Sequence, residues 1–211
     1  MLLFVTDGDA RGLRAIPAQE RSRRTVSAIL DAAGDLLNEG GPDALTTSAL
    51  ADRTGLRVRN VYRYFRDRQA IVATLAERMN TRIESAIADT TDLSDPACSL
   101  DRVIDDLVEQ VMSAAASEPA VVQIRAAMRT SRELQAIDAA SDRRIAGLMA
   151  TALRQRGVRT RRDRLEAGLF VLVTSIGAVL DRAALDSDDG DRAALVREVK
   201  RMAHAYVQTL A

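Results

Sequence analysis

The sequence predicts an all-α protein of nine helices, and three of its features carry that prediction. Apolar residues recur with the 3.6-residue period of a helix from about Pro17 to the end of the chain. No stretch alternates apolar and polar residues between turn residues, as a half-exposed strand does. Residues that cap or stop helices separate the periodic segments. The fold class is therefore helical throughout.

The first three predicted helices form a compact unit. The first covers about 17–39, and Gly40 is placed to end it. The second covers about 47–54 and is capped by Thr47, and the third covers about 58–65. The apolar face of the first helix consists of Val26, Ile29, Leu30, Ala33 and Leu37.

Six further helices are expected. The fourth, over about 68–90, has apolar residues at four-residue spacing and is too long for a three-helix domain, so it should bridge to a second domain. The later start signals are Asp95 and Pro96 for the fifth, Ser117 and Pro119 for the sixth, Thr130 and Glu133 for the seventh, and Thr160 and Asp163 for the eighth. The seventh should end near Gly157, and a polar loop at 186–191 should precede the ninth.

Composition sets limits on the class of protein. The chain has 211 residues, of which 47% are apolar and 28% are charged, as in soluble globular proteins. No run approaches the roughly 18 consecutive apolar residues of a membrane span, which argues against an integral membrane protein. Cys98 has no second cysteine to pair with, and no basic-then-apolar signal region opens the chain. We therefore expect a cytoplasmic protein.

Charge is distributed unevenly along the chain. The 30 basic and 30 acidic side chains cancel, which excludes binding to nucleic acid through bulk attraction alone. Residues 11–68, however, hold 11 Arg against 7 acidic residues. The basic end is the N-terminal one.

Residues 47–66 meet the mechanical demands of a helix-turn-helix. Leu50 faces the core, Ala51 is small where the helices cross, and Gly55 suits a turn with positive φ. An outer face then remains, composed of Arg57, Val58, Arg59, Asn60, Arg63 and Tyr64. Arg can pair with guanine and Asn with adenine in the major groove, and Tyr can donate to a phosphate. The alternative is an ordinary helical hairpin with a solvated arginine face.

Residues 21–79 resemble the DNA-binding domain of the TetR family of bacterial transcriptional regulators. The resemblance rests on the segments 29–33, 45–47 and 61–65, on Leu50 with Ala51, and on Gly55. It implies a helix-turn-helix domain at 20–67 after a flexible tail at 1–19, and an effector-binding and dimerisation domain at 68–211. It also implies a homodimer that a small molecule releases from a palindromic operator.

The same resemblance assigns DNA contacts residue by residue. It implies phosphate contacts at Thr47, Tyr62, Tyr64 and Arg68, and base contacts at Ser48, Val58, Arg59, Asn60 and Arg63. The sequence departs from the family pattern at Arg57, Arg59 and Asn60, where a small cap and then Gly or Ala followed by Thr are usual. The operator is therefore expected to differ from a typical one. Arg11 and Arg14 could reach the minor groove, or belong to an unstructured tail.

The eighth helix is expected to form a dimer interface. Residues 167–180 are apolar around nearly the whole helix, with small residues that allow close approach across a two-fold axis. The interface would use Val173, Gly177, Leu180, Leu195, Val199, Met202 and Tyr206. The alternative is a central core helix in a monomer.

The effector site is less well marked by the sequence. A pocket in a helical bundle offers apolar walls and a few polar groups. The candidates on the fifth to eighth helices are Met112, Arg125, Met128, Met149, Phe170 and Thr174, each of which could instead be ordinary core or surface. The scarcity of aromatic residues favours an aliphatic or amphipathic ligand.

No residues have the spacing of a catalytic or metal site. Neither Cys98 nor His204 has a partner at zinc or nucleophile-base spacing, and the acidic loop 186–191 lacks the pattern of an EF-hand. We expect a ligand-responsive DNA-binding repressor without catalytic activity, metal or cofactor. The rival hypothesis is a helical small-molecule-binding protein or enzyme whose Arg-rich first domain docks a protein partner.

Overall fold

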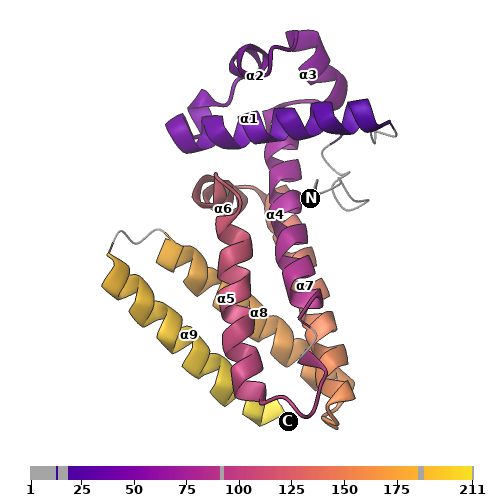
Figure 1. Cartoon of the computed structure of the whole chain (residues 1–211), viewed down its shortest axis with the longest axis vertical. Coiled ribbons are helices and arrows are strands. Elements are labelled where there is room, and N and C mark those ends of the chain that lie inside the picture. The colour runs from indigo at the N-terminus through magenta and orange to yellow at the C-terminus, as the bar shows by residue number, and fades with distance from the viewer. Residues whose placement is uncertain (1–12, 14–18, 91–92, 185–187, 211) are drawn as a thin grey trace. The chain divides into compact units, whose positions relative to one another are not determined.

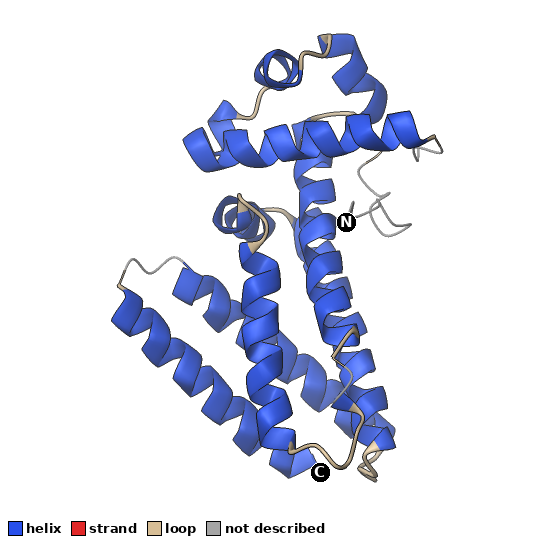
Figure 2. Ribbon diagram, in the orientation of Figure 1, coloured by secondary structure: helices blue, strands red, loops and turns tan. Residues whose placement is uncertain are grey.

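A computed structural model describes residues 13, 19–90, 93–184 and 188–210. These residues form nine α-helices, and their β-structure is limited to one isolated bridge between Leu13 and Phe65 (Figures 1 and 2). The predicted all-α class is confirmed. The helices are α1 (Glu20–Ala44), α2 (Thr47–Thr54), α3 (Val58–Tyr64), α4 (Arg68–Ala88), α5 (Leu100–Ala116), α6 (Val121–Thr130), α7 (Arg132–Gln155), α8 (Arg162–Ala184) and α9 (Asp189–Leu210).

The chain divides into two compact units, each built from two segments. Unit 1 comprises Met1–Thr81 and Ala116–Ile137, and unit 2 comprises Arg82–Ala115 and Asp138–Ala211. Helices α4 and α7 therefore contribute residues to both units. This division does not coincide with the domains at 20–67 and 68–211, because α6 belongs to the unit that contains the three N-terminal helices.

The core of unit 1 joins α1 to the two short helices. Ile29 of α1, Leu50 of α2, and Val61 and Phe65 at α3 are all at most 1% exposed. Their burial fixes the orientation of α2 and α3, since each of these helices is too short to be stable without tertiary packing.

The first helix differs from the expected 17–39 at both ends. It begins at Glu20, and Pro17 lies outside the described residues. Its regular part is interrupted at Gly41, where φ is 66° and ψ is −162°, one residue after the expected stop at Gly40. The glycine that takes the positive φ is therefore the second of the pair.

Two helix caps lie one residue away from their expected positions. The hydroxyl of Thr46, not that of Thr47, accepts the Ala49 amide at 3.1 Å and caps α2. Helix α7 begins at Arg132, and the Ser131 hydroxyl accepts the Leu134 amide at 3.4 Å, so Thr130 is not its cap. In both places adjacent residues carry hydroxyls, and tertiary packing decides which one becomes the cap.

The Asp95-Pro96 signal predicts a start of α5 that is four residues too early. Asp95 instead closes a tight turn, in which its carboxylate accepts the Ala97 amide at 2.8 Å. The Arg156 guanidinium donates to the backbone carbonyls of Leu93, Asp95 and Cys98. These bonds hold the segment in a loop, and α5 begins at Leu100.

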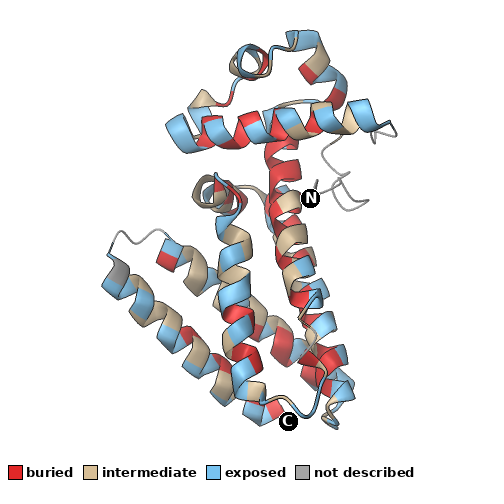
Figure 3. Cartoon of the chain, viewed as in Figure 1, coloured by how far each residue is buried: buried red, intermediate tan, exposed pale blue. Residues whose placement is uncertain are grey.

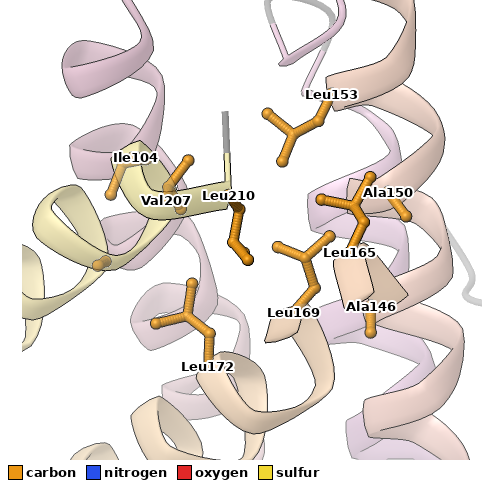
Figure 4. Close-up of a cluster of buried hydrophobic side chains, with 10 residues drawn as sticks. Ile104, Ala146, Ala150, Leu153, Leu165, Leu169, Leu172, Val207 and Leu210 are labelled. Atoms are coloured by element: carbon orange, nitrogen blue, oxygen red, sulfur yellow. The ribbon is translucent and has the colours of Figure 1, made fainter. Parts of the chain in front are cut away.

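The core of unit 2 is formed by α5, α7, α8 and α9 (Figure 4). Leu165, Leu169 and Leu172 of α8 are at most 3% exposed and cluster with Val207 and Leu210 of α9. At Gly168 a Cβ atom would lie 2.8 Å from Leu210 Cδ2, so a larger residue there would force the Leu210 side chain to shift from its place between α8 and α9.

Candidate nucleic-acid interface

The turn between α2 and α3 is built from Ala51, Gly55 and Leu56. Gly55 adopts the left-handed conformation at φ 67°, and its amide donates to the Ala51 carbonyl. The Leu56 amide donates to the same carbonyl at 3.1 Å. A residue with a Cβ would be strained at Gly55, so the sequence fixes the turn and with it the direction in which α3 leaves.

Helix α3, the recognition helix, and the residue before it present polar side chains that have no partner in the described part of the chain. The reading face, defined as Arg57, Val58, Arg59, Asn60 and Arg63, is exposed except for the half-buried Asn60. Among the residues that the structure describes, the side chains of Arg57, Arg59 and Asn60 make no hydrogen bond or ion pair. The hydrogen-bonding capacity of these three side chains is available to a ligand.

Neighbouring arginines behave differently. Arg53 donates to both carboxylate oxygens of Glu39 at 2.7 and 2.6 Å, and these hydrogen bonds hold the pKa of Glu39 below its usual value. Arg66 donates to Asp67 at 2.8 Å, which lowers the pKa of Asp67. Asp67 also accepts the Ala70 amide at 2.8 Å and so caps α4. Arg53 thus joins α2 to α1 and Arg66 bonds within the turn before α4, whereas Arg57 and Arg59 of the reading face have no such bond.

Three of the expected phosphate-contacting residues lie at the surface or close to it. Arg68, at the first position of α4, donates to the Pro42 carbonyl at 2.9 Å and is otherwise exposed. The hydroxyls of Thr47 and Tyr62 are 3.5 Å apart, and 45% of Tyr62 is exposed. Ser48 is exposed as well. The bond to Pro42 restrains the Arg68 guanidinium before any ligand arrives.

Tyr64 does not face outward, so that part of the sequence interpretation is wrong. The residue is 8% exposed, because it lies three positions after the buried Val61 and so on the inward side of α3. Arg63 lies over it, with the guanidinium carbon 5.7 Å from the ring centroid. The ring therefore supports a member of the reading face.

Arg57 occupies the cap position of α3, as the departure from the family pattern indicates. Its backbone is extended, with φ −76° and ψ 144°, and its side chain makes no capping bond. The Arg57 guanidinium therefore does not cap α3.

Helix α8 has exposed and half-buried positions within the single chain (Figure 3). Ala167, Val171, Thr174 and Ala178 are exposed at spacings of four, three and four residues, which places them on one face. Val171, 55% exposed, is the most exposed large apolar residue of the described chain, and the sequence interpretation did not single it out within the apolar run 167–180.

The residues expected at the dimer interface are accessible with one exception. Val173, Gly177, Leu180, Leu195 and Tyr206 are half-buried, and Met202 is 38% exposed. Val199 is 2% exposed in the single chain, so it has no surface to offer a partner and its assignment to the interface is wrong. By length and hydropathy α8 could also cross a membrane, but its Leu165, Leu169 and Leu172 pack in the core of unit 2.

Comparison with known proteins identifies the family. Residues 29–75 match the family described as bacterial regulatory proteins of the tetR family, and residues 99–206 match the tetracyclin repressor-like C-terminal domain. Over 176 residues the chain is 32% identical to the tetracycline repressor protein class A from transposon 1721 of Escherichia coli, which covers 81% of this chain and 72% of that protein. The chain belongs to the TetR family. It is a transcriptional regulator with a DNA-binding and a ligand-binding domain.

Solved structures agree with this TetR-family fold. A TetR-family transcriptional regulator from Streptomyces coelicolor superposes with a TM-score of 0.67 at 23% identity, covering 88% of this chain and 99% of that one. A TetR transcription regulator from Haloarcula marismortui gives a TM-score of 0.68 at 18% identity, covering 89% and 98%. At these identities the likeness concerns the fold.

The six residues expected to bind the effector of this TetR-family protein are not assembled at one described cavity. Arg125 and Met128 belong to unit 1, whereas Met112, Met149, Phe170 and Thr174 belong to unit 2. Met128 is 2% exposed, and Met149 and Phe170 pack against the core cluster of unit 2. Arg143 lies 5.2 Å from the Phe170 ring centroid, and Thr174 donates to Asp142 at 2.8 Å. Their binding role stays a prediction.

A cavity of about 480 Å³ lies between α7 and α8 and has a different lining. Its polar groups already have partners. Arg162 donates to Glu166 at 2.6 Å, Arg154 donates to the Thr160 carbonyl at 3.3 Å, and Thr151 donates to the Gly147 carbonyl at 2.9 Å. A mostly polar lining with internal partners is unlike the apolar pockets that usually hold small ligands.

The described residues hold no group of three or more His, Cys, Asp or Glu side chains suited to a metal ion. Cys98 is half-buried and lies 3.7 Å from an Asp95 carboxylate oxygen, and His204 lies 3.1 Å from Asp105. Asp186 of the acidic loop, and Arg11 and Arg14 of the N-terminal tail, lie outside the described residues.

Proposed function

We propose that this TetR-family regulator is a homodimeric repressor that reads a palindromic operator through α3 and is released by a small molecule. The observation that carries the DNA-binding part is the set of unpartnered polar side chains on the reading face, Arg57, Arg59 and Asn60. An arginine without an acidic partner keeps its full donor capacity for guanine, and a half-buried Asn held at a helix start can pair with adenine.

Val58 and Tyr62 fit the same role. Both side chains are exposed, at 39% and 45%, and their four-residue spacing places them on one face of α3. An apolar side chain in the major groove can contact a thymine methyl group, and a tyrosine hydroxyl can donate to phosphate. The reading face thus combines base-reading and backbone-contacting chemistry within two turns of helix.

Duplex fragments selected from random DNA test the proposal directly. The full-length protein should bind the selected duplex more tightly than random duplex, and both affinities should fall steeply as salt rises, because phosphate neutralisation releases counterions. The rival hypothesis, an Arg-rich domain that docks a protein partner, requires that no duplex be bound at moderate salt.

Arg68 should anchor the protein without contributing to sequence preference. In Arg68→Ala, affinity should fall by a similar factor for selected and random duplexes, and the salt slope should decrease by about 1 per protomer. The measurement is duplex affinity across a salt series. Arg161→Ala is the matched control, because Arg161 is an exposed cation of unit 2 and its loss changes net charge equally. A loss confined to one sequence with an unchanged slope would contradict the assignment.

The uncovered face of α8 supports a homodimer. A second copy can cover that face through a two-fold axis, which brings the same apolar residues together from both chains. Two recognition helices one DNA turn apart then match a palindrome. Operator binding and dimerisation are consequently linked.

Effector release requires coupling between the ligand and DNA sites. Helix α4 begins next to α3 in sequence and runs without interruption from unit 1 into unit 2, so both units contain part of this helix. Suppose that the effector binds more tightly to a dimer whose recognition helices are wrongly spaced for the operator. The effector then weakens operator binding, and the operator must weaken effector binding by the same factor. Small molecules that displace the selected duplex are the probe, with their affinity compared in free and duplex-saturated protein.

The protein is thus expected to act without catalysis and in the cytoplasm, where it meets the chromosome. This expectation rests on the two matched domains, one for DNA binding and one for ligand binding, neither of which requires a catalytic step. A turnover assay on any effector found by displacement tests this, because recovery of the effector unchanged is expected.

A further inference from the structure

An ion triad in unit 1 joins three of its helices. From α4, Arg78 donates through Nε and Nη2 to the two carboxylate oxygens of Glu118 at 3.0 and 2.7 Å. Its Nη1 donates to Asp31 of α1 at 2.7 Å. Glu118 stands in the turn before α6, and its carbonyl accepts the Val121 amide at 3.1 Å. One guanidinium therefore binds α1, α4 and the start of α6.

The triad is buried on the α6 side and open on the α1 side. The side chain of Glu118 is 0% exposed and that of Arg78 is 13% exposed, whereas Asp31 is 63% exposed. Burial disfavours the charge on Arg78, but the hydrogen bonds from Glu118 and Asp31 outweigh it and raise the pKa of Arg78. A buried carboxylate held by both arms of a guanidinium is strongly oriented, because any displacement leaves a charge without solvent or partner.

The Glu118 carboxylate lies close to the backbone of α1. A Cβ atom on Gly34, which is buried in α1, would lie 3.4 Å from Glu118 Oε1, at van der Waals contact. The carboxylate therefore lies against α1 as well as being bonded to α4.

The position of Glu118 in the chain gives the triad its significance. Residues 116–137 pack in unit 1 with residues 1–81, yet both ends of this segment continue into unit 2. Movement of α6 must therefore either carry α1 and α4 with it or break the bonds from Arg78 to Glu118.

We propose that Arg78 and Glu118 are positioning residues for operator binding, which fix α1 and α4 on the start of α6 so that the state of α6 and the affinity for DNA depend on each other. The proposal rests on the proposed function of duplex binding. A triad that only stabilised the fold would change the free energy of unfolding without linking α6 to DNA.

The test is hydrogen exchange at the first amides of α6, residues 121–124, with and without the selected duplex. In the wild-type dimer the duplex should slow exchange there, although these residues lie outside α2 and α3. In Glu118→Gln, which keeps the shape but removes the charge, that slowing should be lost. Affinity for the selected duplex should fall about tenfold with an unchanged salt slope, because the phosphate contacts remain.

Glu84→Gln is the matched control. Glu84 also lies on α4 and accepts both arms of an arginine, Arg144, at 2.9 and 2.7 Å, but that pair belongs to unit 2. This variant should keep both the duplex affinity and the slowed exchange at α6.

A second variant keeps the proposal testable if Glu118→Gln does not fold. Asp31→Asn weakens the open arm of the triad at an exposed residue, so the fold should survive, and it should shift exchange and affinity in the same direction by a smaller factor. The proposal would be overturned if the wild-type protein and both variants had nearly the same duplex affinity and the same exchange at residues 121–124. It would also be overturned if the variants lost folding stability while their duplex affinity and exchange stayed unchanged. If the wild-type protein bound no duplex, the proposed function itself would fail, and the proposal with it.

Discussion

Gly177→Glu should convert the dimer into a monomer that still folds. The free chain has nothing within 4 Å of the place where a Cβ on Gly177 would lie, so the larger side chain has room in the protomer. In a two-fold interface built on α8 the same carboxylate would be buried twice, without a partner, and a buried unpaired charge costs about 3 to 5 kcal/mol. Sedimentation should show monomers at micromolar concentration, and operator affinity should fall by at least about a hundredfold.

Gly147→Glu is the control, because it also replaces a glycine within a helix by glutamate but lies outside the proposed interface. Gly147 lies inside α7, and a Cβ there would also meet nothing within 4 Å, so the substitution is chemically identical and equally accommodated. It should leave the dimer and operator binding intact. A Gly177→Glu protein that still sediments as a dimer, or a wild-type protein that is monomeric at micromolar concentration, would show that α8 is not the interface.

Much of the fold could be predicted because helical periodicity is a local signal. Bounds such as 47–54 for α2 follow from the threonines before the inward-facing Leu50 and Ala51 and from Gly55 after them. Three of the errors arose where two neighbouring residues had the same chemistry. Thr46 and Thr47, Thr130 and Ser131, and Gly40 and Gly41 each offer the same cap or stop, and only tertiary packing selects between them.

The candidate site was less fully predictable, for a related reason. The sequence interpretation placed Arg59 and Asn60 outward, but it did not place Tyr64 correctly, although Tyr64 lies three positions after the buried Val61 and so on the inward side of α3. Nor did it resolve Val199, which is apolar and could serve either core or interface. The bonds between Arg78 and Glu118 join positions 40 residues apart, and no local pattern indicates such a pair.

The second large effect should be loss of base discrimination in Arg59→Ala combined with Asn60→Ala. A well-formed pair between one of these side chains and a base contributes about 1 to 3 kcal/mol of discrimination, so each truncation should lower affinity for the selected duplex by roughly tenfold or more. Binding to random duplex should change far less, because it depends on phosphates. A repeated selection with each single variant should show one flattened position in each half-site.

Asn38→Ala controls for loss of an exposed amide, since Asn38 lies on α1 away from the reading face in sequence, and it should leave the selected sequence unchanged. Arg68→Ala supplies the opposite pattern, a uniform loss with intact preference. Together the variants separate base reading from anchoring within one small domain. Equal losses on selected and random duplex for Arg59→Ala and Asn60→Ala would show that these side chains touch only the backbone, and specificity would then have to come from Arg57, Val58 or Arg63.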